Sequence, residues 1–277
     1  MDFTIKTYKS LLQILMEKKY LFLSFQEYIQ KKYSIQNSNL SFVILRHDVD
    51  RLPQNALRMA QLEAQMNIKS TYFFRVINKT FKPNIIKKIA ELGHEIGYHY
   101  ENLSTVSKQI KNKKYKTNHN NKYINKLFEY ALEDFKMKLK ELRKFYPVKT
   151  ISMHGSPLSK YDNRDLWKKY DYKNEEIIGE PYFDVDFNNI LYITDASREW
   201  NNENINKRDK VNNKFKFTFN HTNDIILGLR KNILPDKIMI NIHPEFWANN
   251  TVEWYRIFLY RKIRNTIKKI FLKYTNN

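Results

Sequence analysis

The chain repeatedly passes from a short apolar run to a segment whose apolar residues recur at helical spacing, and this alternation most restricts its fold. The first unit is SFVILR at 41–46, followed by a helix that begins near Pro53, where proline suits the first helical turn. Further apolar runs follow along the chain, at 70–76, 94–99, 148–154, 190–194 and 237–243. Strands that alternate with helices predict a largely parallel sheet, either open or closed into a barrel.

Ionisable side chains stand at the ends of these predicted strands. His47, Asp48 and Asp50 follow the first run, and four more such residues end or follow later runs: His99, His154, Asp195 and His243. In an α/β barrel the loops after the strands converge on one face and bring distant residues around one ligand. The pattern therefore favours a distorted α/β barrel, built as a single domain, over an open sheet.

Composition limits the chemistry of such a site. The 277 residues, 42% of them hydrophobic, suffice for one α/β barrel, and none is a cysteine, so any metal must be held by His, Asp or Glu. A set of His and Asp residues suits a divalent ion such as zinc with an open position for water, which is the arrangement of a catalytic site. The lack of cysteine, of a signal-peptide pattern and of any long apolar stretch predicts a cytoplasmic protein that does not span a membrane.

Five separated motifs occur in the order RHDVD, STYFFR, GHEIGYH, SMHGSP and NIHPEFW. Together with DNRDLW and YITDASREW, this series resembles the NodB-like polysaccharide deacetylases, and more specifically their HDVD branch. The resemblance implies a distorted (β/α) barrel over 41–247, between an N-terminal helical extension at 1–40 and a basic amphipathic C-terminal helix at 248–277. It also implies metal-dependent removal of an acetyl group from a carbohydrate, in the biosynthesis of cell-surface polysaccharide.

The resemblance further implies roles for single residues. Asp48 matches the aspartate that acts as general base on activated water, and His243 matches the histidine that protonates the leaving group. Asp195 and Arg198 fall where the family orients catalytic groups, and with Trp200 they are the candidates for contact with substrate. Trp200 is open to a second interpretation, as a packing residue of the core.

Asp50 and His99 match two metal ligands of the family, but the chain departs from the pattern at the third. The family places a ligand histidine at the position of Leu103, and leucine cannot bind a metal. Three residues remain as candidates for the third ligand, of which we favour the first: His154, Glu101 and Glu95. The departure also supports an alternative function, a catalytically inactive barrel that binds carbohydrate or a partner protein.

The formal net charge of +20 is concentrated in two segments, 108–126 and 255–274. We expect residues 108–121 to be a surface loop, followed by a long amphipathic helix at about 123–145. In the second segment, apolar residues recur at helical spacing among basic ones: Leu259, Ile263, Ile267, Ile270 and Phe271. Such a helix suits peripheral contact with the anionic inner face of a membrane, where a lipid-linked carbohydrate would be encountered. Its apolar stripe could equally pack on the barrel. No nucleic-acid recognition motif accompanies the charge, so binding of nucleic acid is not predicted.

Overall fold

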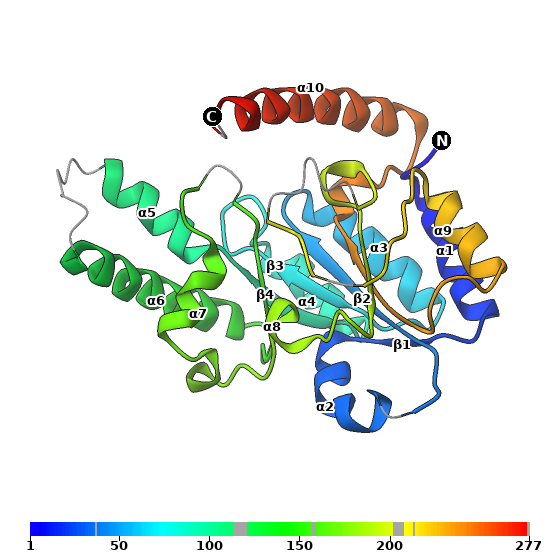
Figure 1. Cartoon of the computed structure of the whole chain (residues 1–277), viewed down its shortest axis with the longest axis horizontal. Helices are drawn as coiled ribbons and strands as arrows, with labels where there is room; N and C mark the ends of the chain where they lie inside the picture. The colour runs from blue at the N-terminus through cyan, green and yellow to red at the C-terminus, as the bar shows by residue number, and fades with distance from the viewer. Residues whose placement is uncertain (37, 113–120, 157–158, 202–207, 213, 276–277) are drawn as a thin grey trace.

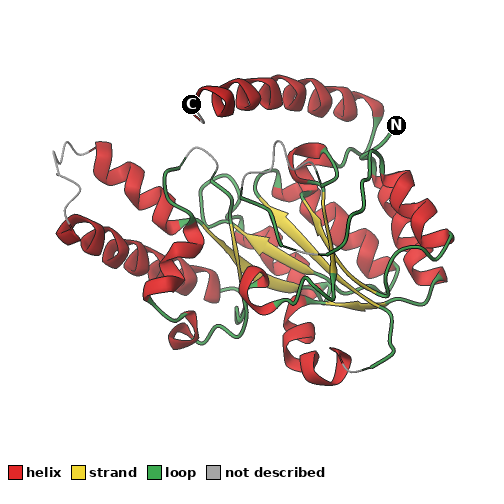
Figure 2. Cartoon of the chain, in the orientation of Figure 1, coloured by secondary structure: helices red, strands yellow, loops and turns green. Residues whose placement is uncertain are grey.

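A seven-stranded parallel sheet forms the centre of the molecule (Figures 1 and 2). The computed structural model describes residues 1–36, 38–112, 121–156, 159–201, 208–212 and 214–275. The strands are β1 (Leu21–Leu23), β2 (Phe42–Val49), β3 (Thr71–Phe74), β4 (Glu95–Tyr100), β5 (Ile151–Met153), β6 (Leu191–Thr194) and β7 (Lys237–Ile242). Their order is β5-β4-β3-β2-β7-β6, and β1 also pairs with β2. Within the described residues no pairing joins β5 to β6. The distorted (β/α) barrel predicted from the sequence is therefore confirmed, in the form of a curled sheet that these two strands do not close.

Ten α-helices surround this sheet within the described part of the chain (Figure 2). They are α1 (Ile5–Glu17), α2 (Phe25–Gln36), α3 (Pro53–Gln65), α4 (Pro83–Glu91), α5 (Asn102–Asn112), α6 (Asn121–Arg143), α7 (Leu166–Lys169), α8 (Pro181–Asp184), α9 (Thr222–Arg230) and α10 (Thr251–Thr275). Proline occupies the first turn of α3 and α4, where its missing N–H is not needed. The stretch 108–121, which was expected to be a loop, is partly helical, because α5 extends through Asn112 and α6 begins at Asn121. Residues 113–120 lie outside the described residues.

The N-terminal segment contributes to the sheet as well as to the surrounding helices. Its strand β1 pairs with the first half of β2, while β3 pairs with the second half. On α1, the buried hydroxyl of Tyr8 donates a hydrogen bond of 2.6 Å to Glu63 of α3, and Glu63 also lies 2.9 Å from His47. Burial raises the pKa of Glu63. The contacts of this carboxylate with His47, His94 and Ser70 outweigh burial and lower its pKa to about 2. The segment 1–40, for which the sequence predicts a helical extension, thus holds two helices and one strand.

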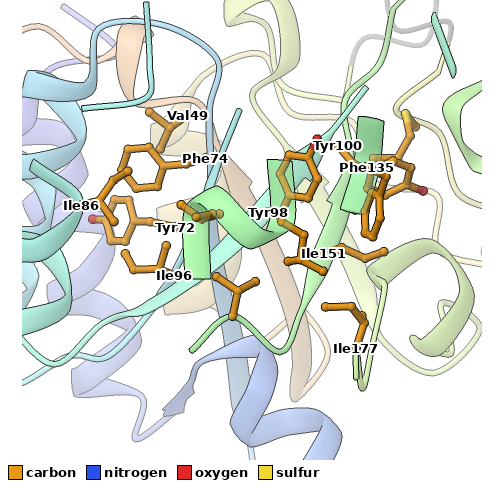
Figure 3. Packing of buried hydrophobic residues seen from close by; sticks show 14 of the residues in the cluster. Val49, Tyr72, Phe74, Ile86, Ile96, Tyr98, Tyr100, Phe135, Ile151 and Ile177 are labelled. Atoms are coloured by element: carbon orange, nitrogen blue, oxygen red, sulfur yellow. The ribbon is translucent and has the colours of Figure 1, made fainter. Parts of the chain in front are cut away.

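Strand β2 runs through the core with every residue buried, and its side chains alternate between two environments. His47 and Val49 face α3 and the cluster shown in Figure 3, where Tyr72 and Phe74 of β3 pack with side chains of β4 and α4. Arg46 and Asp48 point to the other side of the sheet, where they form an ion pair. Because the side-chain period of a strand is two, Asp50 is expected on the same side as Asp48.

Helix α10 lies along one edge of the molecule, over the carboxyl-terminal ends of the strands (Figure 1). Trp254 fixes its first turns by donating a hydrogen bond of 2.5 Å to the carbonyl of Asp2, and Asn265 binds the carbonyl of Ser197 at 3.0 Å. Several apolar side chains of this helix are exposed and do not line the cavity below it: Val252, Tyr255, Leu259 and Ile263. Ile267 is also exposed, but it stands at the rim of that cavity. The side chains of Ile270 and Phe271 lie outside the described residues. In the part of the chain that is described, no helix has the length and apolar character needed to cross a membrane.

Candidate active site

A cavity of about 510 Å³ opens at the carboxyl-terminal ends of the strands. Six of the candidate site residues singled out from the sequence line it together: Asp48, Asp50, His99, Glu101, His154 and His243. They come from β2, β4, β5 and β7 or from the residues directly after these strands. The convergence expected for a barrel of parallel strands is therefore present.

Asp50, His99 and His154 form a cluster whose potential ligand atoms all lie within 4.8 Å of one another. Oδ1 of Asp50 lies 2.9 Å from Nδ1 of His154 and 3.3 Å from Nε2 of His99. The two imidazole nitrogens are themselves 3.3 Å apart. Ligand atoms about 2.1 Å from a tetrahedral zinc ion would be roughly 3.4 Å apart, so these separations suit three ligands of one small cation.

Two further observations fit a cation at this cluster. His99 lies with Nδ1 2.9 Å from the carbonyl of Ser152, which fixes the proton on Nδ1 and leaves the lone pair of Nε2 free for a metal. Oδ1 of Asp50 is buried, yet it has no well-aligned hydrogen bond in spite of the two close imidazoles. Although burial opposes ionisation, His154 and His99 keep the pKa of Asp50 well below its usual value, so the carboxylate is charged. The residues present therefore fit a divalent metal site with His154 as the third ligand.

The other candidates for the third ligand have other partners, although Glu101 also lines the cavity. Both carboxylate oxygens of Glu101 bind Arg75, each at 2.7 Å, and its nearest approach to His154 is 4.0 Å. Glu95 begins β4 at the opposite end of the strand, where it accepts a hydrogen bond of 2.7 Å from Thr71. Leu103, at the start of α5, is fully buried in the core.

Asp48 is held from one side only. Its Oδ2 accepts hydrogen bonds from Arg46 at 2.7 Å and from Asn241 at 3.1 Å, while the buried Oδ1 has no partner. Burial raises the pKa of Asp48, but the Arg46 guanidinium and then His99 lower it further than burial raises it, so the group is ionised at neutral pH. One oxygen is therefore fixed and the other is free to accept a proton inside the cavity.

His243 follows β7 and is oriented by Asp195, which follows β6. Its Nδ1 lies 2.7 Å from Oδ1 of Asp195, and Nε1 of Trp247 donates to the other carboxylate oxygen at 2.7 Å. Burial lowers the pKa of His243, yet the hydrogen bond and charge of Asp195 outweigh it and raise the pKa to about 10. With Nδ1 engaged, Nε2 remains available to a bound ligand.

The three residues expected to contact substrate have other surroundings. Asp195 is fully buried behind His243, and its contact toward the cavity is with that imidazole. Arg198 and Trp200 are not among the residues that line the cavity. The Arg198 guanidinium lies 4.7 Å from the ring centre of Trp254, and Trp200 packs on Phe3 at 5.8 Å. The packing interpretation of Trp200 therefore describes its position, and neither side chain is placed to touch a ligand in this cavity.

Several residues of the site were not found from the sequence. Arg46 and Asn241 each stand two positions before a predicted site residue, so the period of a strand could have placed them on the same face as Asp48 and His243. Glu245, just after His243, lines the cavity, and burial together with the nearby charge of Asp50 raises its pKa to about 7. Arg75 ends the STYFFR motif directly after β3, so its place at the end of a strand could have indicated it, but its contact with Glu101 could not be read from the sequence.

Comparison with known proteins yields similarity of fold only. No family model and no curated protein matches the chain. A CE4 esterase of Streptococcus mutans is 13% identical, with 91% of this chain and 88% of that chain covered and a TM-score of 0.45. The Streptococcus pyogenes deacetylase PplD, solved with acetate, is 13% identical over 61% of this chain and 70% of that one, with a TM-score of 0.42. A CE4 family pseudoenzyme of Bacillus anthracis is 12% identical over 82% of this chain and 62% of its own length, with a TM-score of 0.42. These similarities assign no activity to this chain.

Proposed function

We propose that the protein is a metal-dependent hydrolase that removes an acetyl group from a carbohydrate. The observation that carries this proposal is the arrangement around one cavity of Asp50, His99 and His154 beside a free oxygen of Asp48 and an oriented His243. A zinc ion held by the first three residues would supply Lewis-acid activation of water near neutral pH. Synthesis of cell-surface polysaccharide at the cytoplasmic face of the membrane is the process that we propose it serves.

The residues of the chain then divide the proton transfers between them. Asp48 accepts a proton through Oδ1 from the water that adds to the acetyl carbonyl carbon, while Arg46 and Asn241 hold Oδ2. His243, as the imidazolium, donates a proton to the departing nitrogen or oxygen of the sugar, while Asp195 holds Nδ1. The bond from the acetyl carbon to the sugar breaks, and acetate and the free amine or hydroxyl are the products.

The test is acetate release from an N-acetylated chitooligosaccharide and from an O-acetylated xylan, with metal-loaded protein. We expect Asp48→Asn to lower the rate about 10²- to 10⁴-fold, because the free oxygen that accepts the proton is lost. Asp236→Asn is the matched control, since Asp236 is exposed and precedes β7, at the other end of that strand from His243. Equal activity of Asp48→Asn and wild type would contradict the role of Asp48. No acetate from either substrate would contradict the hydrolase and favour the carbohydrate-binding alternative.

We also propose that α10 places the protein on an anionic membrane surface, where a lipid-linked carbohydrate is met. In support, Leu259 and Ile263 are 56% and 61% exposed and neither lines the cavity, so this side of the helix does not pack on the barrel. No acidic residue follows Glu253, and basic residues such as the exposed Lys262 stand among the apolar ones. An exposed apolar stripe within a basic helix matches the interface of an anionic bilayer.

Substitution of a stripe residue should weaken this contact. We expect Ile263→Glu to reduce cosedimentation with phosphatidylglycerol vesicles about tenfold or more, since burial of an isoleucine side chain contributes about 1.5–3 kcal/mol. Ile233→Glu is the control, because Ile233 is equally exposed, at 60%, but precedes β7 at the opposite end of the strand from the cavity. Equal vesicle binding by the wild type, by Ile263→Glu and by a chain truncated after Glu253 would exclude the membrane contact.

A further inference from the structure

Three arginines gather on the α10 side of the cavity. Arg51 lies in the loop after β2, and Arg261 and Arg264 stand on successive turns of the inner side of α10. All three line the same cavity as the proposed catalytic residues. Helix α10, which Figure 1 shows across the top of the molecule, thus supplies side chains to the site as well as covering it.

Aromatic rings hold these guanidinium groups without neutralising them. Arg51 lies 4.6 Å from the ring centre of Tyr260 and donates a hydrogen bond to its hydroxyl, which also accepts from Arg264 at 2.8 Å. Arg261 stacks at 4.1 Å from the ring centre of Phe246. Stacking fixes the planes of the guanidinium groups and leaves most of their N–H donors unused.

The other two arginines that line the cavity are paired with carboxylates, unlike the three in the cluster. Arg75 binds Glu101 at 2.7 Å, and Arg208 binds Asp162 at 3.1 Å. For the three clustered arginines, no salt bridge joins any of them to a carboxylate within the described residues. Nε of Arg261 is buried and has no hydrogen-bond partner.

The cluster is also under mutual repulsion. Burial first, and then the charges of Arg264 and Arg51, lower the pKa of Arg261, in spite of an opposing contribution from Glu245. Glu245 lines the same cavity, but within the described residues no salt bridge joins it to any of the three arginines. A bound anion with several charges would relieve this repulsion and use the free donors.

We propose that Arg51, Arg261 and Arg264 form a subsite for the phosphate or diphosphate group of the carbohydrate substrate. Three unpaired positive charges match the two or three negative charges of such a group better than the single charge of a carboxylate, and guanidinium groups bind phosphate oxygens in pairs. The identity of the ligand as a sugar phosphate depends on the proposed function. Binding of the anion itself does not.

The test is calorimetric titration of the full chain with inorganic pyrophosphate, and with N-acetylglucosamine 1-phosphate against N-acetylglucosamine. We expect the phosphorylated sugar to bind more tightly than the neutral one. Arg261→Gln and Arg264→Gln should each weaken binding of both anions about 10- to 100-fold, as loss of a charge-assisted hydrogen bond predicts. Arg256→Gln is the matched control, because Arg256 is exposed on the same helix and does not line the cavity.

Each other outcome has a definite meaning. No binding of pyrophosphate at low salt, or equal weakening by Arg256→Gln, would overturn the subsite in favour of unspecific attraction to a basic helix. If Arg261→Gln and Arg264→Gln lost binding to phosphatidylglycerol vesicles but kept pyrophosphate binding, the arginines would serve lipid headgroups, and the subsite would again be overturned. Asp48→Asn should bind pyrophosphate as the wild type does, so failure of the hydrolase and failure of the subsite are distinguished.

Discussion

Asp50→Asn should abolish metal binding, because it replaces the only carboxylate of the cluster with a neutral amide. We expect the wild-type protein to carry about one divalent ion per chain after purification without chelator, and the variant to carry almost none. The loss in affinity should exceed the roughly 10–100-fold that is typical of changes around a metal ligand, because a ligand itself is removed. Elemental analysis with calorimetric titration of Zn²⁺ measures both quantities.

Two further variants identify the third ligand. His154→Ala should lose the metal as Asp50→Asn does, since Nδ1 of His154 lies 2.9 Å from Asp50 and 3.3 Å from His99. Glu101→Gln is the matched control and should keep the metal, because Glu101 is bound to Arg75. Retention of metal by His154→Ala and its loss in Glu101→Gln would assign the third ligand to Glu101. Absence of metal from the wild type, even after reconstitution, would mean that the change at Leu103 leaves the site without function.

The sequence predicted the face of the fold on which the site lies. A polar residue directly after an apolar run marks the carboxyl end of a predicted strand, and parallel strands end on the same face. Asp48, Asp50 and His243 were placed in this way, and the structure brings them to one cavity. His47 occupies the same stretch but faces Glu63, since successive side chains of a strand point to opposite sides. Periodicity within β2 was therefore the better guide than position at its end.

Contacts between distant segments were beyond the reach of the sequence. Helical periodicity indicated α10, but the two sides of that helix differ only through the barrel beside it: Arg261 points into the cavity and Ile263 is exposed. Trp200 likewise suits either a sugar platform or a core, and only its packing against Phe3 decides its place. Side-chain partners separated by many residues are set by tertiary packing, which local pattern does not encode.

His243→Asn should lower acetate release about 10²- to 10⁴-fold while leaving metal binding intact. The asparagine amide can still donate to Asp195, in the place of Nδ1, but it has no group that can transfer a proton to the departing sugar. His221→Asn is the matched control, because the His221 side chain is 70% exposed. Full activity of His243→Asn would contradict the assignment of His243 as proton donor.

Asp195 should influence catalysis by raising the pKa of His243. A change in that pKa on substitution of Asp195 would distinguish a positioning role from a merely structural one. Asp195 outweighs the effect of burial and raises the pKa of His243 to about 10 in the metal-free protein. A folded pKa above the unfolded value of about 6.5 stabilises the fold fully below that value, and this contribution is lost as the pH rises toward 10.

In Asp195→Asn the pKa of His243 should fall, so NMR titration of the metal-free protein should show loss of the imidazolium at lower pH than in the wild type. The pH–rate profile should change in the same direction, because a proton donor works only below its pKa: the alkaline limb of Asp195→Asn should move to lower pH. Trp247→Phe, which removes the second donor to Asp195 but leaves its carboxylate in place, should keep the His243 pKa raised. An unchanged His243 titration in Asp195→Asn would show that the carboxylate does not set the protonation of this imidazole, and the proton donor would have to be sought elsewhere in the cavity, with Glu245 as the next candidate.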